Sequence, residues 1–137
     1  MKDKIMSVWE WLKTCPDTGN MYLIYDGAGD MDAVFIPLGE TVSPFIDDTA
    51  RRLFEGRIVV YERIYPSPNE YAGRGAIDRA EAIREWIDAS AKAGDVPAFP
   101  DGCRVQNVFS LAPGKDAASF EGGWAMYAVD FIIDYIE

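Results

Sequence analysis

The densest group of residues that could do chemistry is the stretch DGAGDMD, Asp26–Asp32, which holds three carboxylates and two glycines. Carboxylates at this density could bind a cation, and glycines could bring backbone amides close to a phosphate. The spacing fits neither site. A calcium loop of the EF-hand type needs a glutamate at its twelfth position, where Pro37 stands, and a GxGxxG motif would not end in aspartate before a strand. Glycine and aspartate are also the residues that turns prefer, so the sequence predicts a turn with no metal or cofactor site.

A second candidate is an anion site formed by Gly73, Arg74 and Gly75 at the start of an expected helix. Free backbone amides and an arginine at such a position could hold a tetrahedral anion. Asp78, however, lies in the first turn of that helix and would complement the helix dipole in place of an external anion. We therefore expect no functional anion site here.

Other reactive groups are sparse. The sequence contains no histidine, which excludes Ser-His and Cys-His pairs and histidine-ligated zinc. Cys15 and Cys103 are far apart and lie in no CxxC motif, so we expect reduced thiols without a catalytic role. Asp130 and Asp134 project from one face of an expected strand, but about 13 Å apart, which is too far for an acid and a base that share one bond. We interpret them as solvating residues and predict no catalytic residue and no cofactor.

The four tryptophans could line a ligand pocket, but most lie at or near the apolar stripes of expected helices, which indicates a core role. Trp11 and Trp124 are the two expected to be exposed. A large aromatic side chain outside the core favours a protein interface. For the same reason we expect contacts with partner proteins at Tyr65, Pro66 and Tyr71, in the loop after the third strand, and at Trp124.

Composition limits the classes of partner. The 137 residues fit one domain, 1–137, and 49% hydrophobic residues are enough for a real core. The 13 basic and 23 acidic residues give a net charge of −10, which opposes binding to nucleic acid and to anionic lipid. Such acidity is usually only a solvated surface, although it could also line a ring through which DNA passes. No signal peptide or membrane span is apparent, so we expect a protein of the cytoplasm until something incorporates it.

Hydrophobic periodicity predicts the elements that position these residues. They are a helix at 5–12, strands at 21–25 and 33–38 joined as a hairpin by the acidic turn, a strand at 57–65, a helix at 76–92, and strands at 103–111 and 124–137. In the last strand the odd-numbered residues from Ala125 to Tyr135 share an apolar face. This order predicts an α+β fold: a single two-layer domain with a mainly antiparallel sheet and two or three helices packed on one face.

The segment 43–56 is ambiguous. Ser43 could cap a short helix, Pro44 could occupy its first turn, and Gly56 could end it. The family resemblance described next implies extended chain instead, and both alternatives stay open.

The sequence resembles a family of minor capsid or tail-terminator-like proteins from long-tailed phages and prophages of Gram-positive bacteria. The resemblance runs over nearly the whole chain, in order and spacing. It is carried by these stretches: SVWEWLKTCP, AVFIPLGE, PFIDD, RIVVYERIYPSPNE, REWID, FPDGCRVQNV and YAVDFIIDYIE.

The resemblance implies a structural protein of the head-tail junction. Relatives of this kind assemble as a ring, a hexamer in the assembled tail, that caps the tail tube and presents a surface to neck or head-completion proteins. The expected location is the bacterial cytoplasm during assembly and then the virion, with no sequence-specific nucleic acid and no membrane as partner. Two alternatives stay open: a small-ligand-binding protein or enzyme with a pocket between sheet and helices, and another head-completion or connector protein.

Overall fold

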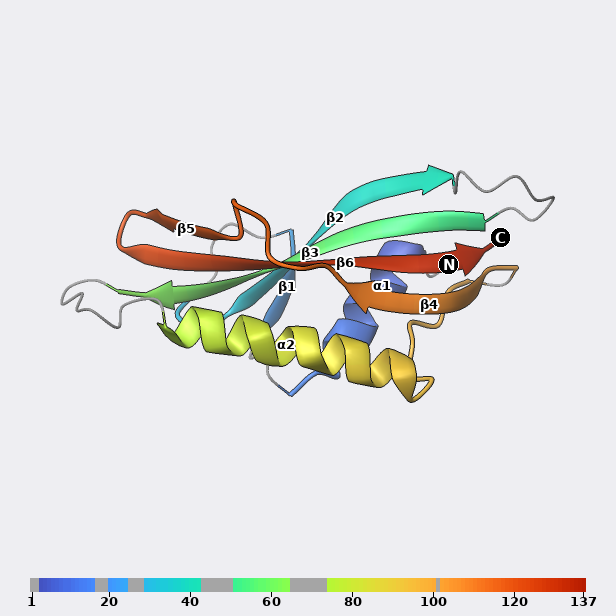
Figure 1. Ribbon diagram of the computed structural model, residues 1–137, viewed down its shortest axis with the longest axis horizontal. Coiled ribbons are helices and arrows are strands. Elements are labelled where there is room, and N and C mark those ends of the chain that lie inside the picture. The colour runs from blue at the N-terminus through green and yellow to red at the C-terminus, as the bar shows by residue number, and fades with distance from the viewer. Residues whose placement is uncertain (1–2, 17–19, 25–28, 43–50, 65–73, 101) are drawn as a thin grey trace.

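The computed structural model describes residues 3–16, 20–24, 29–42, 51–64, 74–100 and 102–137 (Figure 1). Two helices and six strands form one α+β domain, which confirms the predicted fold class. In chain order the elements are α1 (Lys4–Leu12), β1 (Met21–Leu23), β2 (Ala33–Val42), β3 (Arg51–Arg63), α2 (Arg74–Lys92), β4 (Arg104–Ser110), β5 (Ala118–Glu121) and β6 (Trp124–Ile136).

The sheet is built around its two long strands. β3 and β6 pair antiparallel over their whole lengths, from Arg51 opposite Ile136 to Arg63 opposite Trp124. The strand order is β1-β2-β3-β6-β4. β4 pairs with the C-terminal half of β6, and β5 pairs with the N-terminal half of β6 on the same side. The predicted alternation holds in the last strand, where Val129, Phe131 and Ile133 are fully buried.

The predicted hairpin at 21–38 is wrong, because β1 and β2 run parallel, with Met21 opposite Ala33. Parallel strands usually need a longer crossover, but β1 is only three residues long, so the chain has little distance to return before β2 begins. Two non-glycine residues in this connection, Ile24 and Met31, have positive φ. Hydrophobic periodicity predicts that a strand exists and carries no information about its direction.

The ambiguous segment 43–56 is extended wherever it is described. β3 begins at Arg51, so Leu53, Phe54 and Gly56 are strand residues, and residues 43–50 lie outside the described part of the chain. The helix alternative is therefore wrong for 51–56 and the extended alternative is confirmed there. Pairing with strands on both sides outweighs the local helix signals, since tertiary contacts routinely override propensity.

Both helices pack on the same face of the sheet. Asp3 caps α1 by accepting a 2.8 Å hydrogen bond from the Met6 backbone N–H. α2 buries the predicted stripe, with Ile87 rather than Trp86 as its third apolar member, and Gly94 follows at φ 83° as a helix terminator. The layer between helices and sheet is a single core whose largest fully buried members are Tyr135, Phe35, Phe131, Leu12, Ile58 and Ile83.

β5 was not predicted, since residues 112–123 were expected to form a loop. Gly122 and Gly123 have φ of 56° and 83°, as a two-residue type I′ hairpin turn requires, and they join β5 to β6. The Gly-Gly pair is itself a hairpin signal and could have revealed the strand.

Candidate functional site

The acidic stretch 26–32 acts as a capped turn wherever it is described. The Asp32 carboxylate accepts a 2.7 Å hydrogen bond from the Gly29 backbone N–H, and Asp30 accepts one of 2.8 Å from the Arg63 backbone N–H. Residues 25–28 lie outside the described chain. Over the described residues no cluster of three or more histidine, cysteine, aspartate or glutamate side chains could hold a metal ion.

The suspected anion site at the start of α2 is occupied by a carboxylate of the protein itself. Glu62 of β3 accepts a 3.2 Å hydrogen bond from the Ala76 backbone N–H. A Cβ atom at Gly75 would lie 2.6 Å from the Glu62 carboxylate, so the glycine is what lets this carboxylate approach. Arg74 instead pairs with Asp78 one turn along the helix, at 3.1 Å, and Gly73 lies outside the described residues. The helix N-terminus therefore already has its anion.

Asp130 and Asp134 are bound by arginines across the strand pair, so the interpretation of them as solvating residues is wrong. The Arg51 guanidinium donates to both carboxylate oxygens of Asp134, with Nη2 to Oδ2 at 2.6 Å, and the Asp134 side chain is only 12% exposed. Asp130 pairs with Arg57, directly opposite it in register, with Nε to Oδ1 at 2.7 Å. The hydrogen bond with Asp130 outweighs the effect of burial and raises the pKa of Arg57.

These ion pairs lie on the face of the sheet turned away from both helices, here called the open face. Its members alternate along β3 and β6 with the buried core residues. Besides the two ion pairs, half-buried apolar side chains occupy the open face, at Ile36, Leu53, Val59, Met126, Ala128 and Ile132. A partly apolar sheet face crossed by fixed charges is suited to a protein contact.

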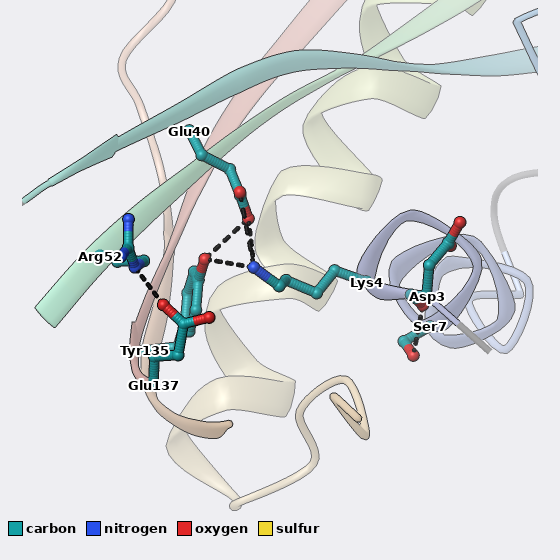
Figure 2. A network of polar contacts seen from close by, with 7 residues as sticks. All are labelled: Asp3, Lys4, Ser7, Glu40, Arg52, Tyr135 and Glu137. Atoms are coloured by element: carbon teal, nitrogen blue, oxygen red, sulfur yellow. Dashed lines mark hydrogen bonds and ion pairs between the residues drawn. The ribbon is translucent and has the colours of Figure 1, made fainter. Parts of the chain in front are cut away.

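A network of three polar side chains ties α1 to the sheet on the opposite face (Figure 2). The Lys4 ammonium donates to the Tyr135 hydroxyl at 2.8 Å and to the Glu40 carboxylate at 3.1 Å, and the Tyr135 hydroxyl donates to Glu40 at 2.7 Å. Burial disfavours the charge on Lys4, but its hydrogen bonds to Tyr135 and Glu40 outweigh burial and raise its pKa. Burial is the main cause that raises the pKa of Tyr135. Arg52 and Glu137 form a further ion pair beside this network.

An apolar cavity of about 350 Å³ opens next to this network. It lies between the start of α1 and the outer part of the β2–β3 pair. Its wall is formed by Asp3, Lys4, Ile5, Pro37, Gly39, Glu40 and Phe54. Of the charged groups at its wall, Lys4 and Glu40 bind each other and Tyr135, and Asp3 caps α1, which leaves the apolar surface as its main feature.

The tryptophans are mainly core residues, and the prediction that Trp11 is exposed is wrong. Trp11 is 5% exposed, packs against Trp86 of α2 at 4.9 Å between ring centroids, and donates its indole N–H to the Asp95 carbonyl. α1 contacts both the sheet and α2, so its buried arc is wider than one stripe. Trp9 donates to the Met21 carbonyl.

Among the predicted contact residues, only Trp124 falls within the described chain; Tyr65, Pro66 and Tyr71 lie outside it. Trp124 is half-buried at the start of β6, on the open-face side. Its ring meets Tyr61 edge-on at 6.4 Å, and the Arg63 guanidinium lies over it at 5.9 Å. The tryptophan thus packs against a tyrosine ring and an arginine at the border of the open face.

Two further findings concern thiols and membranes. Cys15 is buried and Cys103 half-buried, and both are free thiols. Within the ranges that the structure describes, neither helix is long and apolar enough to cross a membrane.

Among known proteins, similarity to this chain is found in the fold and not in the sequence. The sequence matches no protein-family model and no curated protein. Among solved structures, a chain from the "Virion of native gene transfer agent (GTA) particle" matches with a TM-score of 0.65 and 12% sequence identity. The match covers 98% of this chain and 96% of that chain. At this identity the comparison shows a shared fold over the whole domain.

Proposed function

We propose that this chain is a structural protein of a phage or prophage virion. In this proposal it forms a sixfold ring at the head-tail junction, caps the tail tube and joins it to neck or head-completion proteins. The observation that carries the proposal is the fold match, which spans nearly all of both chains and whose partner is part of a phage-like virion.

Features of the described surface support an assembly role. The open face offers half-buried apolar side chains around two ion pairs, and Trp124 packs against Tyr61 and Arg63 at its border. Aromatic residues held in place are common anchors of protein interfaces. We propose that Trp124, with Tyr65, Pro66 and Tyr71, contacts the tail tube or the neck, and that the net charge of −10 keeps DNA from adhering to the ring.

The proposal predicts a gene for a tail-tube protein near this reading frame, and the protein that such a gene encodes is the partner in the test. Purified protein is added to growing tubes, and tube length and end structure are measured by electron microscopy. We expect shorter tubes that end in rings, and we expect the double variant Tyr71→Ala, Trp124→Ala to bind tubes more weakly. Tubes of unchanged length and bare ends would contradict the tube-capping role. Rings that bind portal or adaptor protein instead of tube would favour another connector protein.

A small-molecule site between sheet and helices is less well supported. The cavity of about 350 Å³ beside α1 has mainly apolar walls, and its charged groups are engaged within the fold: Lys4 binds Glu40, and Asp3 caps α1. Enzyme sites need polar groups that converge on the ligand. We therefore propose no catalytic activity for this cavity.

A further inference from the structure

The edges of the sheet differ in whether their outward backbone N–H groups have hydrogen-bond partners. On β4, the N–H of Leu111 points to β6, so those of Ser110 and Val108 point outward. Each outward group has a side-chain acceptor: Asp88 of α2 binds Ser110 at 2.9 Å, and Asn107 binds Val108 at 2.9 Å. These two N–H groups are therefore not free to pair with a further strand.

The outer edge of β2 is covered only in part. β1 pairs with Ala33–Phe35, and beyond it no described residue pairs with the outer side of β2. Leu38 and Val42 in this part are 43% and 66% exposed, although both are apolar. An exposed apolar edge strand is a template for pairing with another chain.

The register shows which backbone groups of this edge point outward. The Tyr61 N–H donates to the Asp32 carbonyl, and the Tyr61 carbonyl accepts from the Met31 N–H, just before β2 begins. The odd-numbered residues of β3 therefore point their backbone N–H and C=O groups toward β2. By this alternation the pairs of Gly39 and Thr41 with β3 are the hydrogen-bonded ones. The N–H and C=O groups of Glu40 and Val42 therefore point outward.

β5 presents a second open edge. The Ala128 N–H donates to the Ala117 carbonyl at 2.8 Å, and the same alternation turns Ser119 and Glu121 toward β6. The backbone groups of Ala118 and Phe120 thus point outward, and no described strand pairs with them. All of β5 is exposed, and Phe120 is 66% exposed.

The side chain of Phe120 and the cavity beside β2 lie on the same face of the sheet. Phe120 is opposite Ala125, whose side chain is buried on the helix side, so Phe120 points to that side. The cavity is on the helix side too, because Ile5 of α1 and the core residue Phe54 line it. A cavity of about 150 Å³ can hold a benzene ring, so about 350 Å³ is ample for a phenyl group.

The two open edges lie at opposite ends of the long axis of the molecule (Figure 1). A contact between unlike patches at opposite ends is head-to-tail, and it generates a closed ring if the rotation per copy closes. A contact between like patches would stop at a dimer.

We propose that copies of this chain join head-to-tail. β5 of one copy adds to the outer edge of β2 in the next copy, and Phe120 enters the cavity lined by Ile5, Pro37 and Phe54. Backbone hydrogen bonds supply the pairing and the phenyl group supplies the specificity, as in strand addition generally. This inference rests on the proposed ring and names the surfaces that would build it.

Cross-linking of two variants that each carry one accessible cysteine tests the contact directly. Ala118→Cys and Val42→Cys, each with Cys103→Ser, are mixed and treated with a short bismaleimide, with and without tail tubes; Cys15 is 3% exposed and does not compete. We expect a cross-linked pair that contains one copy of each variant, and little product from either variant alone. Three outcomes would overturn the proposal: products that join two copies of the same variant, cross-links of Val42→Cys to tube protein only, or no product in either condition.

A matched pair of substitutions gives a second readout. Phe120→Ser should weaken assembly of copies at least tenfold, measured by sedimentation, while Phe109→Ser should leave it unchanged. Phe109 is an exposed phenylalanine on β4 that points to the open face. Equal effects of the two substitutions would contradict the assigned contact.

The outcomes separate this inference from the proposed function. Tube-capping rings without the mixed cross-link would reject the β5–β2 contact and leave the ring function standing. Mixed cross-links in open chains that never close or cap tubes would support the contact and reject the ring. A double variant that carries both cysteines should give a ladder of products that ends at the ring number.

Discussion

Replacing Gly56 with alanine should destabilise the fold, because the core leaves no room for a methyl group at this position. Gly56 lies in the middle of β3, and a Cβ atom there would be 2.5 Å from Cζ of Phe131 and 2.9 Å from Cε1 of Phe35. Both rings are fully buried and cannot move aside freely. The backbone of Gly56 does not have positive φ, so the expected cost comes from space and not from conformation.

The magnitude follows from known overpacking costs. Extra methyl groups in a packed core cost about 1–3 kcal/mol. Unfolding entropy is about 2.1 cal/mol/K per residue, so a chain of 137 residues loses about 3.5 °C in Tm per kcal/mol. We expect Gly56→Ala to lower Tm by roughly 3–10 °C.

Thermal unfolding followed by circular dichroism measures this shift, with Gly114→Ala as the control. A Cβ atom at Gly114 meets nothing within 4 Å, so that variant should unfold at or slightly above the wild-type temperature. Phe131→Leu should recover part of the loss in the double variant, with a coupling energy of about 0.5 kcal/mol or more. A wild-type Tm for Gly56→Ala, or strictly additive losses in the double variant, would refute the packing argument.

Three further substitutions test the polar contacts, each by urea unfolding. Asp134→Asn should cost roughly 1–3 kcal/mol, since it leaves the Arg51 guanidinium without its carboxylate, and an unchanged midpoint would contradict this role. Glu62→Gln should cost roughly 0.5–1.5 kcal/mol by removing the anion at the start of α2, with an effect that shrinks at high salt. Wild-type stability should fall as pH rises through about 10, because the raised pKa values of Lys4 and Tyr135 let the folded state keep protons that the unfolded state loses. Lys4→Met should make this fall shallower, and an equal slope in both proteins would exclude the contribution of Lys4.

The helices and most strands could be predicted because their signals are local. The 3.6-residue stripe of α2 and the alternation of β6 both appear in the structure at the predicted residues. Trp11 was misjudged because a second neighbour, Trp86 of α2, widens the buried arc of α1. How two helices meet is set by tertiary packing, which no single stripe reveals.

Contacts across strands could not be predicted for the same reason. Arg57 and Asp130 are 73 positions apart, and only the register of β3 with β6 brings them face to face. Gly56 looked like a helix terminator, since the local sequence gives no sign of the two phenyl rings that require a glycine there. The direction of β1 is likewise a property of the connection, not of the strand.

Four carboxylates of the described residues serve contacts within the fold. Glu62 serves the start of α2, Asp134 and Asp130 bind arginines, and Glu40 is shared by Lys4 and a tyrosine hydroxyl. Carboxylates used in this way hold the protein together. In contrast, no described strand pairs with the outer part of the β2 edge or with the outward edge of β5, and exposed apolar side chains lie beside both. An exposed edge of this kind can pair with a strand of another polypeptide.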